Sequence, residues 1–107
     1  MAVDIEAVNR LAREYAEDVS RELPVEKAVL FGSYAKETAT EQSDVDICFF
    51  LKSYSGKRKV DLVTQILGIG GEKYCQVGFE PIVFATSEIQ RGNPFVREIL
   101  ETGIELL

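Results

Sequence analysis

Apolar residues recur every three or four positions in three parts of the chain, with charged residues between them. These parts run from about residue 4 to 23, from about 57 to 67 and from about 94 to 102. Such spacing places the apolar side chains on one face of an α-helix. The sequence therefore predicts three amphipathic helices, and Ser87 is expected to cap a short further helix over residues 87–91.

Short apolar runs lie between these helices and predict extended strands. Residues 28–31 and 47–51 are rich in aromatic and β-branched side chains, and residues 74–77 and 79–86 are similar. Pro81 removes a backbone donor from the last run, so that strand lies at a sheet edge or contains a bulge. Together the elements predict an α/β fold in one domain, residues 1–107: a small mixed sheet with helices mainly on one side.

Two segments of this pattern invite more specific expectations. The second predicted helix is followed by Gly68-Ile69-Gly70-Gly71. This run contains three glycines and is expected to end the helix. The chain closes on an apolar tail that includes Ile104 and residues 106–107. On a small acidic domain such a tail is expected to pack on the sheet edge or to meet a partner.

The stretch between the first two strands, residues 32–46, carries the clearest candidate chemistry. Asp44 and Asp46 are two residues apart on a predicted strand, so both side chains lie on the face opposite Val45. Two carboxylates held this close repel each other, and a divalent cation between them relieves the repulsion. Oxygen ligands favour Mg²⁺ or Mn²⁺. We therefore predict a metal site at Asp44 and Asp46.

Gly32 and Ser33 lie at the other end of the same stretch, directly after the first strand. Glycine lets the backbone approach a ligand closely, and Ser33 can cap a short following helix and offer its hydroxyl and amide to an oxyanion. Taken alone, a Gly-Ser pair is usually a turn and an Asp-x-Asp usually a solvated edge. Their combination in one strand–turn–strand unit predicts a phosphate cradle that faces a carboxylate pair.

The composition narrows the chemistry that this unit can support. An apolar content of 46% in 107 residues excludes a disordered chain. The absence of histidine excludes imidazole bases, Ser-His-Asp catalysis and His-ligated zinc. With 12 basic and 18 acidic residues the net charge is −6, and such a surface repels nucleic acid, which disfavours a polynucleotide substrate. Any catalysis must therefore use carboxylates and metal.

The cysteines and the apolar runs indicate a cellular setting. Cys48 and Cys75 occur in apolar, strand-like contexts without metal-binding spacing, so we expect two buried thiols. No run approaches the roughly 20 apolar residues of a membrane span. The sequence therefore predicts a cytoplasmic protein without a membrane partner. Its oligomeric state is open, and a homo-oligomer is one option.

The motif residues also carry a resemblance to a known family. The chain contains Gly32-Ser33, Ala35 and, at the appropriate spacing, Ser43-Asp44-Val45-Asp46. This pattern resembles the signature of the DNA-polymerase-β-like nucleotidyltransferase superfamily. The small size and the closing segment, residues 93–106, resemble its minimal branch, the antitoxin-type partners of helical HEPN-domain toxins.

The resemblance implies an activity and a set of site residues. The expected reaction is transfer of a nucleoside monophosphate, AMP from the substrate ATP, to a protein hydroxyl with Mg²⁺ or Mn²⁺. It further implies that Gly32, Ser33 and Ser43 bind the nucleotide and that a third carboxylate joins Asp44 and Asp46 as catalytic and metal-binding residues. Glu80 is the candidate for that third position.

Glu80 has two interpretations from its own position. It shares a side of its predicted strand with apolar residues, which is anomalous for a carboxylate without a nearby cation. Alternatively, it is a solvated glutamate at the end of a strand.

The chain departs from the family pattern at two positions, and these keep other functions open. Glu37 stands where the family usually has glycine, and Glu80 stands where it usually has aspartate. Both departures favour an alternative in which the protein is a binding module that neutralises a partner toxin by steric contact. Transfer to a small molecule such as an aminoglycoside is a third option, opposed by the absence of a substrate domain.

Overall fold

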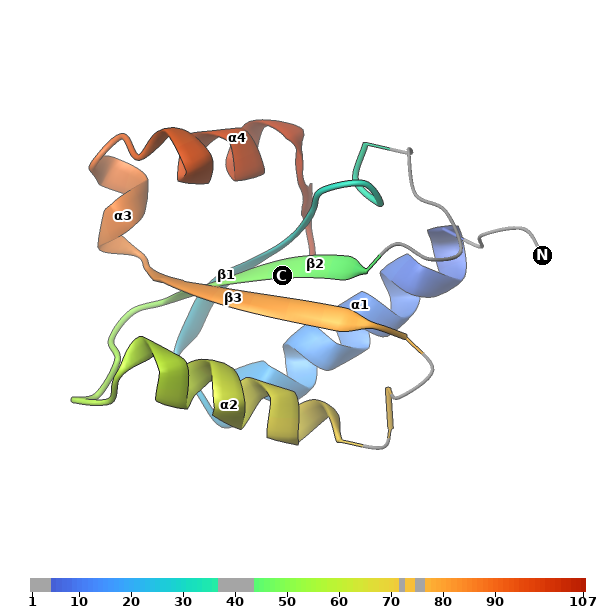
Figure 1. Cartoon of the computed structure of the whole chain (residues 1–107), viewed down its shortest axis with the longest axis horizontal. Helices are drawn as coiled ribbons and strands as arrows, with labels where there is room; N and C mark the ends of the chain where they lie inside the picture. The colour runs from blue at the N-terminus through green and yellow to red at the C-terminus, as the bar shows by residue number, and fades with distance from the viewer. Residues whose placement is uncertain (1–4, 37–43, 72, 75–76) are drawn as a thin grey trace.

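The computed structural model describes residues 5–36, 44–71, 73–74 and 77–107 (Figure 1). The helices in these ranges are α1 (Ile5–Ser20), α2 (Lys59–Gly70), α3 (Ser87–Gln90) and α4 (Pro94–Thr102), and the strands are β1 (Val25–Phe31), β2 (Val45–Leu51), β3 (Phe79–Ala85) and β4 (Ile104–Glu105). Within the same ranges, no helix has both the length and the apolar character needed to cross a membrane.

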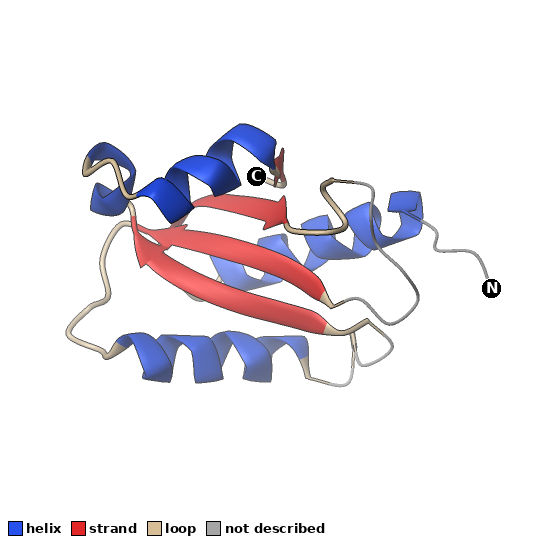
Figure 2. Ribbon diagram, turned by 45° about the horizontal axis from the view of Figure 1, so that its top comes forward, coloured by secondary structure: helices blue, strands red, loops and turns tan. Residues whose placement is uncertain are grey.

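The strands form one mixed sheet in the order β3-β2-β1-β4. β2 and β3 run parallel, whereas β1 is antiparallel to both β2 and β4. The long helices α1 and α2 pack on one face, and α3 and α4 lie on the other (Figures 1 and 2). The predicted α/β fold, with helices mainly on one side of a mixed sheet, is therefore confirmed.

Strand β2 lies at the centre of the core because it is apolar on both faces. Phe49 and alternate neighbours point toward α1 and α2, where the Phe49 ring meets Tyr15 edge-on at 6.0 Å between centroids. Cys48 and Phe50 point the other way and pack under Val96 of α4 and its neighbour Ile99. This second face departs from the apolar pattern at the start of β2, where its residue is Asp46.

The two sheet edges explain two features of the sequence. Thr86 donates its N–H to the carbonyl of Leu51 on β2 at 2.9 Å. Because N–H direction alternates along a strand, the backbone nitrogen of Pro81 points away from β2. Its missing N–H therefore costs no hydrogen bond between the two strands. β3 is therefore an edge strand. At the other edge, Leu106 donates its N–H to Ala28 at 2.8 Å and its side chain is buried, so the apolar tail packs on the sheet.

The glycine-rich run ends the second helix as predicted, but the helix extends three residues farther than expected. α2 continues through Gly68 to Gly70, and Gly71 is its C-cap, with a φ of +45° and an N–H that donates to the carbonyl of Leu67. Helix packing explains the glycine at position 70, since a Cβ there would lie 3.1 Å from Cε1 of Tyr15 on α1. Gly70 therefore allows α1 and α2 to approach closely.

Smaller differences concern the remaining segments. Tyr74 and Val77 lie in turn or bend conformations and not in a strand, and Cys75 lies outside the described residues. Ser87 is the first residue of α3, while Thr86 occupies its capping position. The last helix agrees with the prediction: the Asn93 side chain accepts hydrogen bonds from the first turn of α4, including one of 3.0 Å from Phe95.

Candidate functional site

The sheet places Asp46 and Glu80 side by side. In the antiparallel pairing Asp46 lies opposite Phe31 of β1, and in the parallel pairing it lies opposite Glu80 of β3. All three positions belong to the face that α4 covers, as Cys48 shows two residues farther along β2. The predicted third carboxylate therefore lies directly beside the predicted metal-binding strand.

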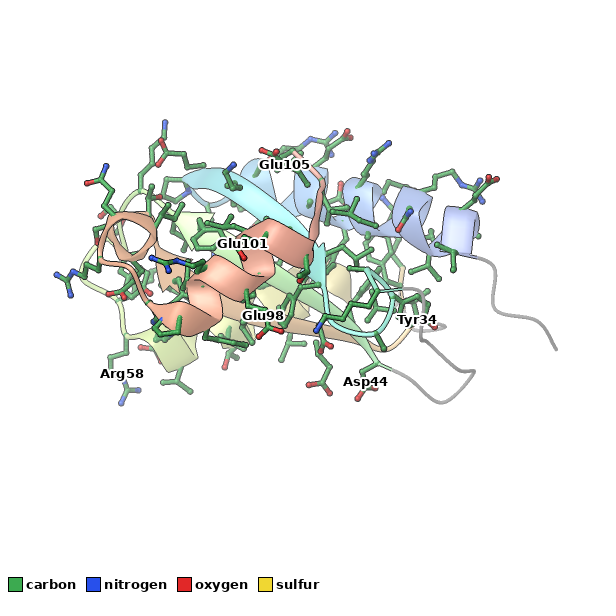
Figure 3. The ribbon with its side chains drawn as sticks, turned by 90° about the horizontal axis from the view of Figure 1, so that it is seen from above. Tyr34, Asp44, Arg58, Glu98, Glu101 and Glu105 are labelled. Atoms are coloured by element: carbon green, nitrogen blue, oxygen red, sulfur yellow. The ribbon has the colours of Figure 1, made fainter. Side chains whose placement is uncertain are left out.

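Helix α4 covers part of that face and leaves acidic side chains accessible at the start of β2 and β3. Val96 and Ile99 cover the sheet around Cys48, whereas Asp46 is half-buried and Asp44 and Glu80 are exposed. Figure 3 shows Asp44 at the end of the molecule opposite Arg58. Asp44, Asp46 and Glu80 thus lie together at the start of β2 and β3, and we call these three residues the acidic row.

The backbone turn after β1 closes on this row. Gly32 has a φ of +76°, and a Cβ at this position would lie only 2.5 Å from Oδ2 of Asp46. Gly32 is therefore required both by its backbone conformation and by the closeness of the carboxylate. Gly78 is similar on the other side, because a Cβ there would lie 3.2 Å from Oδ1 of Asp44.

The short helix expected after Ser33 is a single turn over the residues that can be described. Residues 32–36 form this turn, and Lys36 donates its backbone N–H to the carbonyl of Gly32 at 3.1 Å, a helix-type hydrogen bond. Ser33 lies in the turn, next to the glycine that contacts Asp46. Ser43 and Glu37 lie outside the described residues, so the prediction for Ser43 stays a prediction.

The electrostatic environment of the row disfavours its central charge. Burial, followed by the neighbouring charges of Glu80 and Asp44, raises the pKa of Asp46 above its ordinary value of 3.8. An ionised Asp46 is therefore under strain in the folded protein without a cation. A positively charged ligand at this point would relieve the repulsion.

The donor set agrees with a metal that arrives together with a phosphate. Among the residues with described positions, no three histidine, cysteine, aspartate or glutamate side chains gather closely enough to hold an ion by themselves. Mg²⁺ commonly binds through one or two carboxylates and completes its shell with substrate phosphates and water. Asp44 and Asp46 fit that pattern, and Glu80 as a direct ligand stays a prediction.

A stability measurement tests the strain on Asp46. We expect Asp46→Asn to be more stable than the wild type near about pH 7 in chelator, because asparagine carries no charge for burial and the neighbouring carboxylates to disfavour. The difference should shrink as pH falls through the folded-state pKa and vanish below the unfolded value, where the wild type is itself protonated. Urea unfolding at several pH values measures this.

Asp61→Asn is the matched control because its pKa is shifted the other way. Hydrogen bonds from Arg58 lower the pKa of Asp61. Its amide variant should therefore bring no gain near neutral pH. Equal behaviour of the Asp46 and Asp61 variants would contradict the assigned strain.

Sequence reasoning missed one contact beside the site. Lys36 Nζ lies 3.1 Å from Oε1 of Glu98 and so connects the turn to α4. Lys36 offers a signal, because it is the one basic residue within residues 32–46. Glu98 offers none, because 62 positions separate it from its partner.

Comparison with known proteins identifies the family. A family model described as a nucleotidyltransferase domain matches residues 12–104, which is most of the chain and includes the turn and the acidic row. The chain belongs to the nucleotidyltransferase domain family. The resemblance inferred from the Gly-Ser and Asp-x-Asp motif is therefore confirmed.

Relatives of this nucleotidyltransferase include an archaeal protein of similar length. A protein of Methanocaldococcus jannaschii named "putative protein adenylyltransferase" is 26% identical over 98 residues, which span 90% of this chain and 95% of that protein. The described function of that relative bears on this chain only as a proposal.

Two solved structures share the fold. A "putative nucleotidyltransferase" from Sulfolobus solfataricus superposes with a TM-score of 0.66 at 22% identity, covering 94% of this chain and 80% of that one. A structure described as a toxin–antitoxin with AMP-PNP gives a TM-score of 0.58 at 14% identity, covering 89% and 72%. At these identities the similarity establishes the fold.

Proposed function

We propose that this nucleotidyltransferase transfers AMP from ATP to a hydroxyl group of a partner protein in the presence of Mg²⁺ or Mn²⁺. The observation that carries the proposal is the half-buried carboxylate of Asp46, crowded by Glu80 and Asp44 and contacted by the backbone of Gly32. The turn that phosphates can approach therefore lies beside the carboxylates that need a cation. Transfer from a metal-bound nucleotide requires both features in one place.

Each site residue has a role in this proposal. Asp44 and Asp46 would hold the metal, while Gly32, Ser33 and Ser43 would cradle the phosphates. When bound, the metal neutralises charge that develops on the leaving pyrophosphate.

Glu80 is placed to serve the acceptor. It is exposed beside Asp46, on the open part of the face, where a hydroxyl of another protein can enter. The hydroxyl oxygen bonds to the α-phosphorus, and the bond from the α-phosphorus to the oxygen that bridges the α- and β-phosphates breaks, which releases pyrophosphate. Glu80 accepts the hydroxyl proton in this step. Without such an acceptor the hydroxyl would be a poor nucleophile.

The nucleotide and the partner are inferred from the relatives and the family resemblance. The archaeal relative is named for protein adenylylation, and one structural neighbour is a toxin–antitoxin with AMP-PNP. We propose accordingly that the acceptor is a helical HEPN-type toxin and that this chain acts as its antitoxin in the cytoplasm.

A second candidate function is neutralisation by contact alone. The observations that favour it are the two departures from the family pattern, Glu37 in place of glycine and Glu80 in place of aspartate. A protein that only blocks its partner needs no complete metal site. This candidate predicts complex formation without any covalent product.

One experiment separates the two candidates. A purified HEPN-type toxin is incubated with ATP, Mg²⁺ and the wild-type protein, and its intact mass is measured. A gain of one or more AMP groups supports the transferase. An unchanged mass together with a complex that blocks the toxin would instead leave only the binding module.

The metal site has its own binding test. Titration of Mn²⁺ and ATP into the wild type should give a signal, and Asp44→Asn/Asp46→Asn should weaken binding about tenfold or more, because it removes both charged metal ligands. The matched control is Asp61→Asn, which removes one exposed carboxylate outside the acidic row. Metal-dependent ATP binding unchanged in the double variant would refute the site.

A further inference from the structure

The ion pair between Lys36 and Glu98 lies at the mouth of the candidate site. Lys36 belongs to the turn that contains Gly32, and Glu98 belongs to α4. Together with Gly32 they line a small cavity of about 120 Å³, whose other walls are Phe31, Phe95, Ile99 and Thr102. In Figure 3, Glu98 lies between Glu101 on α4 and Asp44 in the acidic row.

The charges around this cavity are unfavourable for a polyphosphate. Glu98 lines the cavity with a carboxylate, and the carboxylate of Asp46 lies against Gly32, which forms part of the cavity wall. Lys36 is the cation that the described part of the chain places in the cavity wall next to Gly32. Lys59 lies instead over the Phe84 ring, 4.0 Å from its centroid. A triphosphate at the turn would therefore draw on Lys36.

Stability gives little reason for the ion pair. The side chains of Lys36 and Glu98 are 47% and 57% exposed, and ion pairs with such exposure contribute little to folding. α4 is held on the sheet by Val96 and Ile99, which are buried against Cys48 and its neighbours. The pair is therefore weak enough for a ligand to break.

We propose that Lys36 binds the triphosphate and that Glu98 is its resting partner, which the triphosphate displaces. The inference rests on the proposed function, because it names a phosphate-binding residue of the same site. Glu98 then weakens nucleotide binding because it occupies the Lys36 ammonium, which the phosphates need. Its removal should tighten binding, and removal of Lys36 should weaken it.

The size of the effect follows from the exposure of the pair. Breaking an exposed ion pair costs at most a small fraction of typical binding energies, so Glu98→Gln should tighten ATP binding about two- to fivefold. Lys36→Gln should weaken binding by about fivefold or more, because a charge-assisted hydrogen bond to phosphate is lost.

A double-mutant cycle tests whether Glu98 acts through Lys36. Titration of ATP, and of inorganic tripolyphosphate, with Mg²⁺ is measured for the wild type, Glu98→Gln, Lys36→Gln and the double variant. If Glu98 acts through Lys36, its substitution should have little effect once Lys36 is absent. An equal gain in both backgrounds would show a general charge effect and overturn the proposal.

Glu101→Gln is the matched control. Glu101 lies on the same helix and is exposed, and its substitution removes the same charge as Glu98→Gln. Because Glu101 does not line the cavity, ATP binding should stay within about 1.5-fold of wild type. A gain equal to that of Glu98→Gln would also overturn the proposal. Circular dichroism of each variant verifies that all remain folded.

The same titrations distinguish this proposal from the proposed function. If the wild type binds Mg²⁺ and ATP, and Lys36→Gln binds them equally well, the role of Lys36 is wrong while the transferase stands. If neither the wild type nor Glu98→Gln binds ATP or tripolyphosphate, both proposals are wrong.

Discussion

Glu80→Gln should slow AMP transfer to the partner by at least about a hundredfold, since a positioned proton acceptor contributes roughly 10²–10⁴ to such reactions. The parallel register places Glu80 beside Asp46, on the exposed part of the site. Glutamine keeps the volume of the side chain but cannot accept the hydroxyl proton. The initial rate of AMP incorporation, followed by intact mass, measures the loss.

The effect should be confined to the chemical step. ATP affinity and toxin binding should stay near wild type, because glutamine preserves the shape of an exposed side chain. Glu101→Gln, an exposed substitution on α4, is the control and should transfer AMP at the wild-type rate. Should Glu80→Gln transfer AMP as fast as the wild type, the transferase would survive but the third carboxylate would have to lie elsewhere.

Phe49→Ala should lower the free energy of unfolding by about 3–5 kcal/mol. Phe49 lies in the central strand, is 0% exposed and packs edge-on against Tyr15 of α1. Its removal leaves a cavity between the sheet and both long helices that rigid neighbours cannot fill. A domain of this size has a total stability of about 5–15 kcal/mol, so the loss is a large fraction.

Thermal and urea unfolding measure the change. For a domain near this length the melting temperature should fall by at least about 10 °C. Phe95→Ala is the matched control, because Phe95 has the same side chain but is 47% exposed on α4. We expect it to cost about 1 kcal/mol. Similar losses for the two variants would contradict the assignment of the core to the β2 side that faces α1 and α2.

Local patterns in the sequence determined most of the elements and half of the site. The spacing of apolar residues by three or four predicted the long helices, apolar runs predicted β1, β2 and β3, and Asn93 with Pro94 marked the start of α4. Because side chains alternate along a strand, Asp44 and Asp46 had to share a face wherever the strand lay. The edge position of Pro81 followed from its missing N–H. Each of these depends only on neighbouring residues.

Tertiary packing decided what surrounds the aspartates. The parallel register of β2 and β3 placed Glu80 beside Asp46, and α4 covered the part of the same face around Cys48. The contact of the Gly32 backbone with Asp46 likewise depends on how β1 pairs with β2. These arrangements follow from strand order and from helix coverage, which depend on burial summed over the whole sheet.

The same reasoning explains what sequence patterns misjudged or missed. Gly70 signals a helix end by local propensity, but its lack of a side chain is used for the approach of Tyr15. Lys36 and Glu98 are 62 positions apart, and no local pattern predicts their contact, which forms only when α4 packs on the sheet. Local propensity acts within a few residues, whereas contacts between distant residues are chosen by the packing of the complete core.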